Sequence, residues 1–333
     1  MSQTKHDWTE KEILEIYNMP LLDLIYEAAA VHRKFNASSE VQVSSLLSIK
    51  TGACSEDCAY CPQSARYSTG IDVEPLMKVE KVIETAKIAK ESGATRFCMG
   101  AAWRELKDNK DFEKVLEMVK EVNALGMEVC CTLGMLTESQ AKKLADAGLY
   151  AYNHNVDTSP EFYKKIITTR AYEDRLRTID NVRKAGVTVC SGGIIGMGES
   201  VKDRVGMLLT LSSLNPHPES VPINALIPVK GTPMGNNKLV SVWEMARMVA
   251  TARIVMPKSV VRLSAGRINI SKEGQALCFL AGANSIFLGD KLLTQSNPEA
   301  NEDMEMFKIL GLKPREAFKD LKKKLEPCVE HNV

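Results

Sequence analysis

One stretch of the chain decides how the rest is interpreted: VSSLLSIKTGACSEDCAYC, residues 43–61. Its first part, residues 43–49, is an apolar run with β-branched residues at both ends, and it predicts a β-strand. Its second part places Cys54, Cys58 and Cys61 in the spacing C-x₃-C-x₂-C. Three thiols are therefore expected on one short loop at the carboxyl end of a strand.

The spacing of these cysteines favours an iron–sulfur cluster over other kinds of cysteine site. Three thiolates on one loop suit three irons of a cubane cluster and leave the fourth iron open to a small molecule. A structural zinc site needs four ligands, and the nearest histidines, His32 and His154, lie far along the chain. A disulfide with one cysteine left over fits a small secreted protein, not a chain of 333 residues. We therefore expect a 4Fe–4S cluster with one open iron.

A repeating unit of helix, glycine and strand runs along the chain. Helical stretches stop at a glycine, which caps a helix in the left-handed conformation, and an apolar run follows within a few residues. The pattern predicts five strands, at residues 96–100, 128–132, 150–153, 187–190 and 285–289. Further apolar runs predict three more, at residues 43–49, 221–227 and 259–263, which makes eight in total. Eight strands alternating with helices predict an α/β fold of the closed (β/α)₈, TIM-barrel type. An open doubly wound sheet is the alternative.

No low-complexity linker divides the chain, so we expect a single domain over residues 1–333. Its expected parts are an N-terminal helical extension at 1–40, the barrel at 41–292 and a C-terminal tail at 293–333.

Local signals also predict individual helices. An N-terminal helix beginning at Thr9 and a second one at residues 21–35 are expected to plug the bottom of the barrel. Pro75 is expected to open a barrel helix, and the segment Thr137–Gln140 has the capping-box spacing at the start of another. The charged segment 319–326 is expected to form a closing helix.

The composition is that of an ordinary globular protein without a charge bias. Lys+Arg 43 against Asp+Glu 42 gives a net charge of +1, which argues against nucleic acid or an anionic membrane surface as a partner. The polar start has no signal-peptide core, and no apolar stretch is long enough to span a bilayer. Nine cysteines, an odd number scattered along the chain, fit a reducing compartment. We expect a soluble, cytoplasmic protein.

Four further soft or charged side chains fall on four different predicted strands. They are Cys98, Cys130 or its neighbour Cys131, Cys190 and Arg262. Any one cysteine alone is explained as a small buried apolar residue. Arg262 is harder to explain in this way, because a guanidinium inside an apolar strand needs a partner to offset its desolvation. Since inward-facing residues of a barrel share one lumen, these side chains are expected to form a second metal site.

The cysteine motif, with Tyr60 inside C-A-Y-C, resembles the signature of the radical S-adenosylmethionine (radical SAM) family. This resemblance implies a 4Fe–4S cluster on the three loop cysteines whose open iron chelates SAM. It also implies reductive cleavage of SAM to methionine and a 5′-deoxyadenosyl radical. Four longer runs are similar to the biotin synthase family in particular: CMGAAWR at 98–104, YNHNVDT at 152–158, VCSGGIIG at 189–196 and RLSAGR at 262–267.

The similarity to the biotin synthase family implies a second cluster. This 2Fe–2S cluster would be ligated by Cys98, Cys130, Cys190 and Arg262. Arginine is an unusual ligand because its guanidinium normally stays protonated, so its assignment comes from the resemblance and not from chemistry. Cys131 departs from the family pattern, and its side chain should face the opposite side of the sheet from Cys130. Cys278 and Cys328 are expected to be bystanders.

The same resemblance implies contacts to SAM and to the substrate. The residues implied to bind SAM are Tyr60, Asn155, Asp157, Arg175, Ile194 and Ile227. Asp157 is expected to accept the ribose hydroxyls and Arg175 to bind the SAM carboxylate, although Arg175 alone is also explained as a solvated helix charge. The residues implied to bind the substrate are Asn153, Asn155, Asn224 and Thr294. Asn224 is expected to match a cyclic urea on both edges, and Thr294 to anchor a carboxylate.

The implied reaction converts dethiobiotin to biotin, the last step of biotin biosynthesis, through two hydrogen abstractions that each precede one C–S bond. No catalytic side chain beyond the cluster ligands is expected, and a flavodoxin-type reducing partner and a homodimer are further implications. The alternatives are another radical SAM enzyme, lipoyl-forming or hydrogenase-maturation-like, or a non-catalytic iron–sulfur electron carrier. A lipoyl-type enzyme would need a second clustered cysteine motif near its N-terminus, which this sequence lacks.

Overall fold

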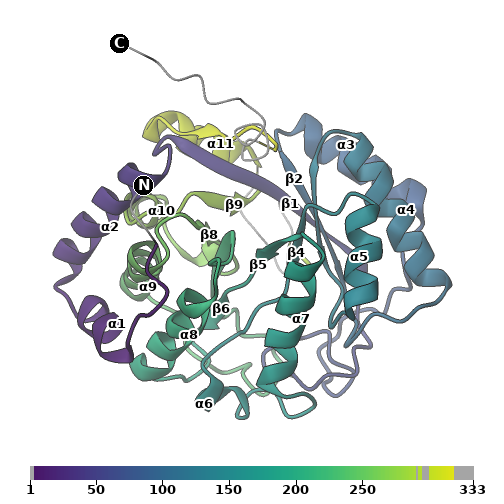
Figure 1. Ribbon diagram of the computed structural model, residues 1–333, viewed down its shortest axis with the longest axis horizontal. Coiled ribbons are helices and arrows are strands. Elements are labelled where there is room, and N and C mark those ends of the chain that lie inside the picture. Colours follow the sequence, from purple (N-terminus) through teal and green to yellow (C-terminus); the bar gives the residue numbers. More distant parts are fainter. Residues whose placement is uncertain (1–3, 290–291, 295–299, 319–333) are drawn as a thin grey trace.

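The computed structural model describes residues 4–289, 292–294 and 300–318. Strands lie at the centre of this structure and helices surround them (Figure 1). In chain order the strands are β1 (Glu40–Lys50), β2 (Arg96–Ala101), β3 (Glu128–Thr132), β4 (Ala151–Asn153), β5 (Thr188–Cys190), β6 (Gly193–Ile195), β7 (Ser220–Ala225), β8 (Val260–Leu263), β9 (Ser285–Phe287) and β10 (Lys313–Pro314).

The central sheet is parallel and closes on itself. Its order is β1-β2-β3-β4-β5-β7-β8-β9, and β9 pairs back onto β1 with Gln42 opposite Ser285. β6 continues the position of β5 and also pairs with β7. This closure confirms the predicted (β/α)₈ barrel. It excludes the open doubly wound sheet, in which the two edge strands stay unpaired.

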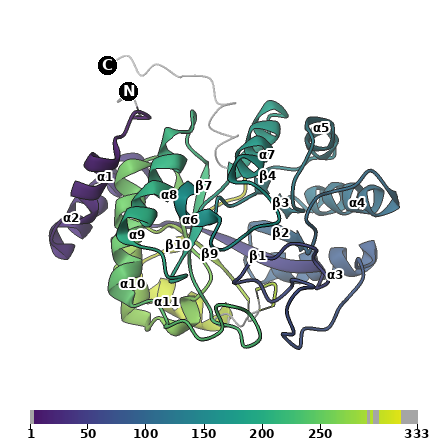
Figure 2. The ribbon, with the colours of Figure 1, turned by 90° about the horizontal axis from the view of Figure 1, so that it is seen from below.

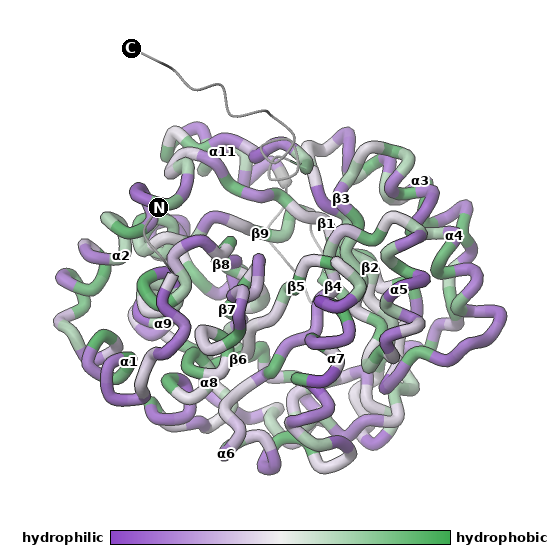
Figure 3. Tube along the Cα trace, in the orientation of Figure 1, coloured by the Kyte–Doolittle hydropathy of each residue, from purple (hydrophilic) through white to green (hydrophobic). Residues whose placement is uncertain are grey.

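Helices cover the outside of the barrel between successive strands. They are α3 (Val79–Glu91), α4 (Lys110–Ala124), α5 (Glu138–Asp146), α6 (Pro160–Tyr163), α7 (Tyr172–Lys184), α8 (Val201–Ser213), α9 (Val242–Val255) and α10 (Lys272–Leu280), with a 3₁₀ turn at Arg267–Asn269. The capping box predicted at Thr137 and Gln140 is present at the start of α5. Figure 3 shows hydrophilic and hydrophobic segments alternating along these helices, as expected where one face packs on the barrel.

The prediction that Pro75 opens a helix is wrong. α3 begins only at Val79, with Lys78 as its N-cap. Between Pro75 and the helix, the backbone N–H of Met77 donates to the Ile49 carbonyl of β1 at 2.7 Å. The chain is therefore held in an extended conformation beside β1 before the helix can start.

The two N-terminal helices, α1 (Glu10–Tyr17) and α2 (Leu21–Phe35), do not plug the bottom of the barrel as expected. Figures 1 and 2 both place them outside the barrel, along the flank formed by α8 and α9. The Trp8 indole donates to the Val255 carbonyl at the end of α9, and Arg247 of α9 donates to the carbonyl groups of Tyr17 and Met19. These contacts to the outer helix fix where α1 and α2 pack.

The chain beyond β9 contains a helix that the sequence did not suggest, α11 (Ala300–Leu310). The buried Asp303 of this helix pairs with the buried Arg267, with 2.7 Å between Asp303 Oδ2 and Arg267 Nη2. The helix expected at residues 319–326 and the bystander Cys328 lie outside the described residues. None of the described helices is long and apolar enough to cross a membrane.

Alternation along the strands divides the buried side chains into two sets. Cys131 packs in the large core between the sheet and the outer helices, whereas Cys130 packs inside the barrel with Cys98 and Phe287. The prediction that Cys130 and Cys131 face opposite sides of the sheet is therefore confirmed. Cys278 is buried in α10, away from the barrel interior.

His32 on α2 predicts a pH dependence of stability. Burial, and then the nearby Arg253 and Arg33, lower the pKa of His32 from 6.5 to about 4. As the pH falls below 6.5, His32 binds a proton in the unfolded chain but stays neutral in the folded protein. Stability is therefore lost between pH 6.5 and pH 4, by about 2 kcal/mol at pH 5. Denaturant unfolding at pH 7.5 and pH 5 should show a smaller loss for His32→Gln than for the wild type. Equal losses would contradict this assignment.

Candidate active site

The three loop cysteines follow β1 at the carboxyl end of the barrel. Gly52 and Ala53 take positive φ angles of 72° and 53°, which turn the chain out of the strand. Cys58 is buried, Cys54 and Cys61 are partly buried, and all three are free thiols. Burial raises the pKa of each thiol, to about 12 for Cys58 and to about 11 for Cys61. A metal bound here would have to displace these protons.

Backbone amides already point at two of these sulfurs. The N–H of Glu56 hydrogen-bonds Cys54, and the N–H groups of Gln63 and Ser64 hydrogen-bond Cys61, which partly offsets the effect of burial on the thiol pKa values. Such donors stabilise a thiolate more than a thiol. Cys54 and Cys61 therefore already have N–H donors that would stabilise their thiolate forms.

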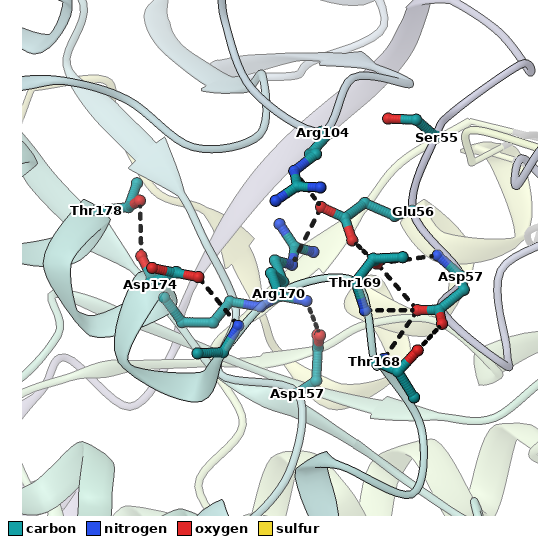
Figure 4. A network of polar contacts seen from close by, with 12 residues as sticks. Ser55, Glu56, Asp57, Arg104, Asp157, Thr168, Thr169, Arg170, Asp174 and Thr178 are labelled. Carbon is teal, nitrogen blue, oxygen red and sulfur yellow. Dashed lines mark hydrogen bonds and ion pairs between the residues drawn. The ribbon is translucent and has the colours of Figure 1, made fainter.

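Two acids between the cysteines tie the loop to the segment before α7 (Figure 4). The Asp57 carboxylate accepts from the backbone N–H groups of Thr168 and Thr169 at 2.9 and 3.2 Å, and from both hydroxyls. These hydrogen bonds lower the pKa of Asp57 to about 2 although burial opposes them. The buried Glu56 accepts from the Thr169 hydroxyl. Two loops far apart in sequence are therefore fixed to each other.

Glu56 also lies between two guanidinium groups. Its Oε1 is 3.5 Å from Arg104 Nε and 3.8 Å from Arg170 Nε, and the carboxylate is almost fully buried (Figure 4). Arg104 follows β2, so the contact joins the cysteine loop to a second strand end. Pairing with positive charges offsets the free-energy cost of removing the carboxylate from water.

The Asp57 contacts predict a selective effect of mutation. In Asp57→Ala the loop loses its hydrogen bonds to Thr168 and Thr169, and a cluster held there should be lost about tenfold faster under chelator. A cluster at the lumen site should be lost at the same rate as in the wild type. Decay of visible absorbance, resolved by Mössbauer typing of the iron that remains, measures both. Asp72→Ala, an exposed acid later in the same loop, is the matched control. Equal acceleration at both sites would contradict a local role for Asp57.

A second ion pair lies beneath the loop. Arg175 on α7 is buried and its Nη2 donates to Asp157, whose φ is 68°. Its Nε donates to the Tyr163 hydroxyl at 3.0 Å and its Nη1 to the Asn155 carbonyl at 2.9 Å. The explanation of Arg175 as a solvated helix charge is therefore wrong. β4 ends at Asn153, so Asn155 and Asp157 lie on the loop that follows the strand.

One cavity of about 260 Å³ opens at the carboxyl end of the barrel and reaches into its lumen. It brings together most of the residues implied by the sequence, namely Tyr60, Cys61, Asn153, Asn155, Asp157, Ile194, Asn224, Ile227, Arg262 and Thr294. Arg175 does not line the cavity and reaches it through Asp157. Leu293 and Thr294 also line this cavity.

The three cavity asparagines differ in how their amides are used. Asn224 donates to the Gly193 carbonyl at 2.9 Å and accepts from the Ala265 N–H at 3.2 Å, so both edges of its amide are already engaged by backbone. Asn155 accepts from the Gly192 N–H at 3.1 Å. The side-chain amide oxygen of Asn153, Oδ1, is buried and has no hydrogen-bond partner in the described structure. An orphaned polar atom on a cavity wall marks a place for a ligand donor.

The four lumen residues also come together as expected. Cys98 and Cys130 are direct neighbours across β2 and β3, and Arg262 Nη1 lies 3.9 Å from the Cys190 sulfur. A hydrogen bond between Cys98 and Cys130, helped by Arg262, lowers the pKa of Cys98 to about 7 and raises that of Cys130. The orientation of the Arg262 guanidinium is fixed by a hydrogen bond, which its Nε donates to the Ser285 hydroxyl at 2.9 Å. Its Nη1 is left facing the sulfur.

These donors fit iron–sulfur clusters better than single ions. No group of three Cys, His, Asp or Glu side chains in the described residues could hold one metal ion. A mononuclear zinc site needs its sulfurs to converge within about 2.3 Å of a point, whereas the thiolates of a cluster are shared among several irons. The free thiols on the loop and those in the lumen are thus two separate sets of possible cluster ligands.

Several residues at this end of the barrel were missed by sequence reasoning. Glu56 and Asp57 lie inside the cysteine motif, between Cys54 and Cys58. Two adjacent acids at this position were the available sequence signal. Their partners at residues 168–170 carry no local signature, because a Thr-Thr-Arg run resembles any polar turn. The buried Gln42, Arg96 and Glu128 beneath the lumen also resembled surface residues in the sequence.

Comparison with known proteins places this geometry in a family. The Radical SAM superfamily matches residues 48–211, and the Biotin and Thiamin Synthesis associated domain matches residues 222–313. Methylornithine synthase (PylB) has the same fold with a TM-score of 0.79 at 19% identity, covering 95% of this chain and 96% of that one. The maturase HydG of Carboxydothermus hydrogenoformans has a TM-score of 0.81 at 16% identity, covering 95% of this chain and 78% of that one.

Sequence relatives are much closer. A biotin synthase of Cytophaga hutchinsonii is 67% identical over 320 residues, which are 96% of this chain and 95% of that protein. A biotin synthase of Nostoc punctiforme is 58% identical over 98% of both chains. The mitochondrial biotin synthase of Arabidopsis thaliana is 60% identical over 93% of this chain and 82% of that protein. With this identity over nearly its whole length, the chain belongs to the biotin synthase family of the radical SAM superfamily.

Proposed function

We propose that this protein inserts sulfur into dethiobiotin to form biotin, using SAM and two iron–sulfur clusters. The observation that carries the proposal is that the wall of one cavity contains both Cys61 of the loop site and Arg262 of the lumen site. A substrate in that cavity would touch both sites at once. An electron carrier has no need of such a space, and a radical enzyme with one cluster would leave the lumen thiols without a purpose.

The chain offers a separate ligand set for each cluster. Cys54, Cys58 and Cys61 would hold a 4Fe–4S cluster, and Cys98, Cys130, Cys190 and Arg262 would hold a 2Fe–2S cluster. When bound, the first would supply the electron that cleaves SAM and the second the sulfide that enters the product. The protein's part is to position the reactants and exclude water, since a carbon radical is readily quenched by the wrong hydrogen donor.

The cavity residues suggest how SAM would be oriented. Asp157 and Asn155 would receive the ribose hydroxyls, and Tyr60, Ile194 and Ile227 would pack the adenine, as all five line the cavity. The contact between Arg175 and the SAM carboxylate, implied by the resemblance, stays a prediction, because Arg175 reaches the cavity through Asp157 and does not line it. Three of its five N–H groups are already used by Asp157, Tyr163 and the Asn155 carbonyl, so the guanidinium is rigid and keeps donors to spare.

The substrate would lie deeper, among the asparagines. The unpartnered Asn153 oxygen would accept an N–H of the cyclic urea. Asn224 keeps only its second N–H and a second lone pair for the urea, so it would contribute a weaker contact than the sequence suggested. Thr294 would bind the carboxylate. Leu46, Pro222 and Phe287 give the cavity an apolar wall that keeps water out.

Anaerobic reconstitution with iron and sulfide tests this proposal. We expect about six irons per chain in two Mössbauer environments. With a reductant and SAM the protein should form 5′-deoxyadenosine, and with dethiobiotin also biotin. Formation of 5′-deoxyadenosine without biotin, by protein carrying both clusters, would favour another radical SAM reaction. Absence of both products from fully loaded protein would favour an electron carrier.

Partners and location are part of the same proposal. The cleavage needs one electron from outside, and we assign that role to a flavodoxin-type protein. The eight cysteines among the described residues are all free, which supports a reducing compartment, the cytoplasm. We also expect a homodimer, which analytical ultracentrifugation of the reconstituted protein would test.

A further inference from the structure

A buried polar layer lies at the amino end of the barrel, below the lumen thiols. Gln42 on β1, Arg96 on β2 and Glu128 on β3 are exposed by only 3%, 5% and 1%. Arg96 donates to Glu128 Oε2 through Nε at 2.8 Å, and its Nη2 is 2.7 Å from the same oxygen. No role has been given to these residues so far. At the bottom of a TIM barrel the ordinary explanation would be stability alone.

The orientation of Gln42 connects this layer to the lumen. Its amide nitrogen donates to Glu128 Oε2 at 3.3 Å, and its amide oxygen accepts from Arg262 Nη2 at 3.1 Å. An amide has one donating and one accepting end, whereas a carboxylate only accepts and a guanidinium only donates. Glu128 therefore selects which end of Gln42 faces Arg262. With the opposite orientation, the amide N–H groups would face the N–H groups of Arg262, and the amide oxygen would face the Glu128 carboxylate oxygen.

Arg262 depends on this arrangement for its direction. Its Nη2 donates to Gln42 and to the Ser44 hydroxyl, each at 3.1 Å, and its Nε donates to Ser285 at 2.9 Å. Two of the three nitrogens are thus fixed, and the planar guanidinium leaves the third, Nη1, beside Cys190. Removing one of these hydrogen bonds would leave the Arg262 guanidinium freer to rotate.

The C-terminal segment 313–318 closes the layer from below and is called the strap here. β10 pairs with β1, and the Arg315 N–H donates to the Val41 carbonyl at 2.8 Å. The Phe318 N–H donates at 2.8 Å to Oε1 of Glu128, the oxygen that Arg96 and Gln42 do not use. The Phe318 ring packs edge-on against Tyr150, with centroids 5.5 Å apart. Both oxygens of the buried carboxylate are therefore engaged.

We infer that Glu128 is a positioning residue for Arg262, that it acts through Gln42, and that the strap holds it in place. The inference rests on the proposed function, because Arg262 matters only as a ligand of the lumen cluster. Outer partners that orient metal ligands typically change metal affinity or activity by about 10- to 100-fold when they are removed. A purely structural ion pair between Arg96 and Glu128 would not involve Gln42 at all.

Gln42→Met separates the two explanations. Methionine has a similar length and no amide, so the Arg96–Glu128 pair and the strap keep their contacts while Arg262 loses one anchor. Reconstituted variant should show an altered visible and resonance Raman spectrum of the 2Fe–2S cluster. The half-life of that cluster under chelator should be at least about tenfold shorter. SAM cleavage at the loop cluster should stay within about twofold of the wild type.

Two further variants complete the experiment. Glu128→Gln removes the charge that selects the orientation of Gln42 and should give the same spectral change, so it also serves if Gln42→Met does not fold. Lys313→Ala, an exposed position of the strap, is the control and should match the wild type. A wild-type spectrum and half-life in either folded Gln42 or Glu128 variant would overturn the inference. If the wild type itself holds only one cluster, the proposed function fails instead.

Discussion

Cys58→Ala is expected to abolish the loop cluster and SAM cleavage together. Cys58 is the middle cysteine of the triad and the most deeply buried of its three thiols. With two thiols left, a cubane cluster would lack the ligands that separate three closed irons from one open iron. The expected result is 5′-deoxyadenosine at background level and iron reduced from about six to about two per chain. Liquid chromatography and iron analysis of the same sample measure both.

The control for this variant is another buried cysteine. Cys278→Ala removes a fully buried thiol of α10, outside both cysteine sets, and should keep both clusters and full activity. A variant at Cys58 that kept the iron content and cleavage rate of the wild type would show that the loop does not hold the cluster. Loss of the lumen cluster as well would show that the two sites do not assemble independently.

The barrel could be predicted because its signals are local. Five expected helix ends carried a glycine, and Gly93, Gly126, Gly148, Gly186 and Gly282 all take positive φ angles in the structure. An apolar run follows each glycine, and a closed sheet is the way to bury so many parallel strands. Strand lengths were less accurate, since β1 runs three residues earlier than expected and the fifth position is interrupted between Cys190 and Gly193.

The elements placed wrongly are those whose position depends on contacts between distant segments. α1 and α2 have amphipathic patterns that fit any apolar surface, and the contacts of Trp8 and Arg247 decide that this surface is α9. Pro75 carries a helix-start signal that is overridden by the hydrogen bond from Met77 to β1. The local sequence predicts that a helix forms, but it does not predict the surface against which that helix packs.

The same limit applies to the candidate site. The cysteine loop could be predicted because its three cysteines are close in sequence. The lumen set was implied by the family resemblance, and alternation along the strand predicts only that Cys130 and Cys131 face opposite sides of the sheet. The clamp between Asp57 and Thr168 joins residues 111 positions apart, and Phe318 reaches Glu128 across 190 positions. Glu128 and Arg96 look like surface charges until the sheet closes around them. Such pairs have no signature before the fold is known.

Cys190→Ala is expected to separate the two halves of the proposed reaction. Cys190 ends β5 inside the barrel, where Arg262 Nη1 faces it, and the loop triad has no hydrogen bond to this strand among those described. Loss of one lumen ligand should therefore prevent stable assembly of the 2Fe–2S cluster. Biotin formation should fall to background, whereas SAM cleavage should remain within several-fold of the wild type. Quantifying 5′-deoxyadenosine and biotin from one reaction measures the ratio.

Cys131→Ala is the sharper control for this prediction, because Cys131 is fully buried beside Cys130 yet packs on the outer side of the sheet. Both variants remove one sulfur from the barrel wall, so a general loss of packing would affect them alike. Only the loss of a lumen ligand should stop biotin formation while cleavage continues. Equal loss of both products in Cys190→Ala would mean that the lumen thiols support the loop cluster or the fold. The division of labour between the two sites would then be wrong.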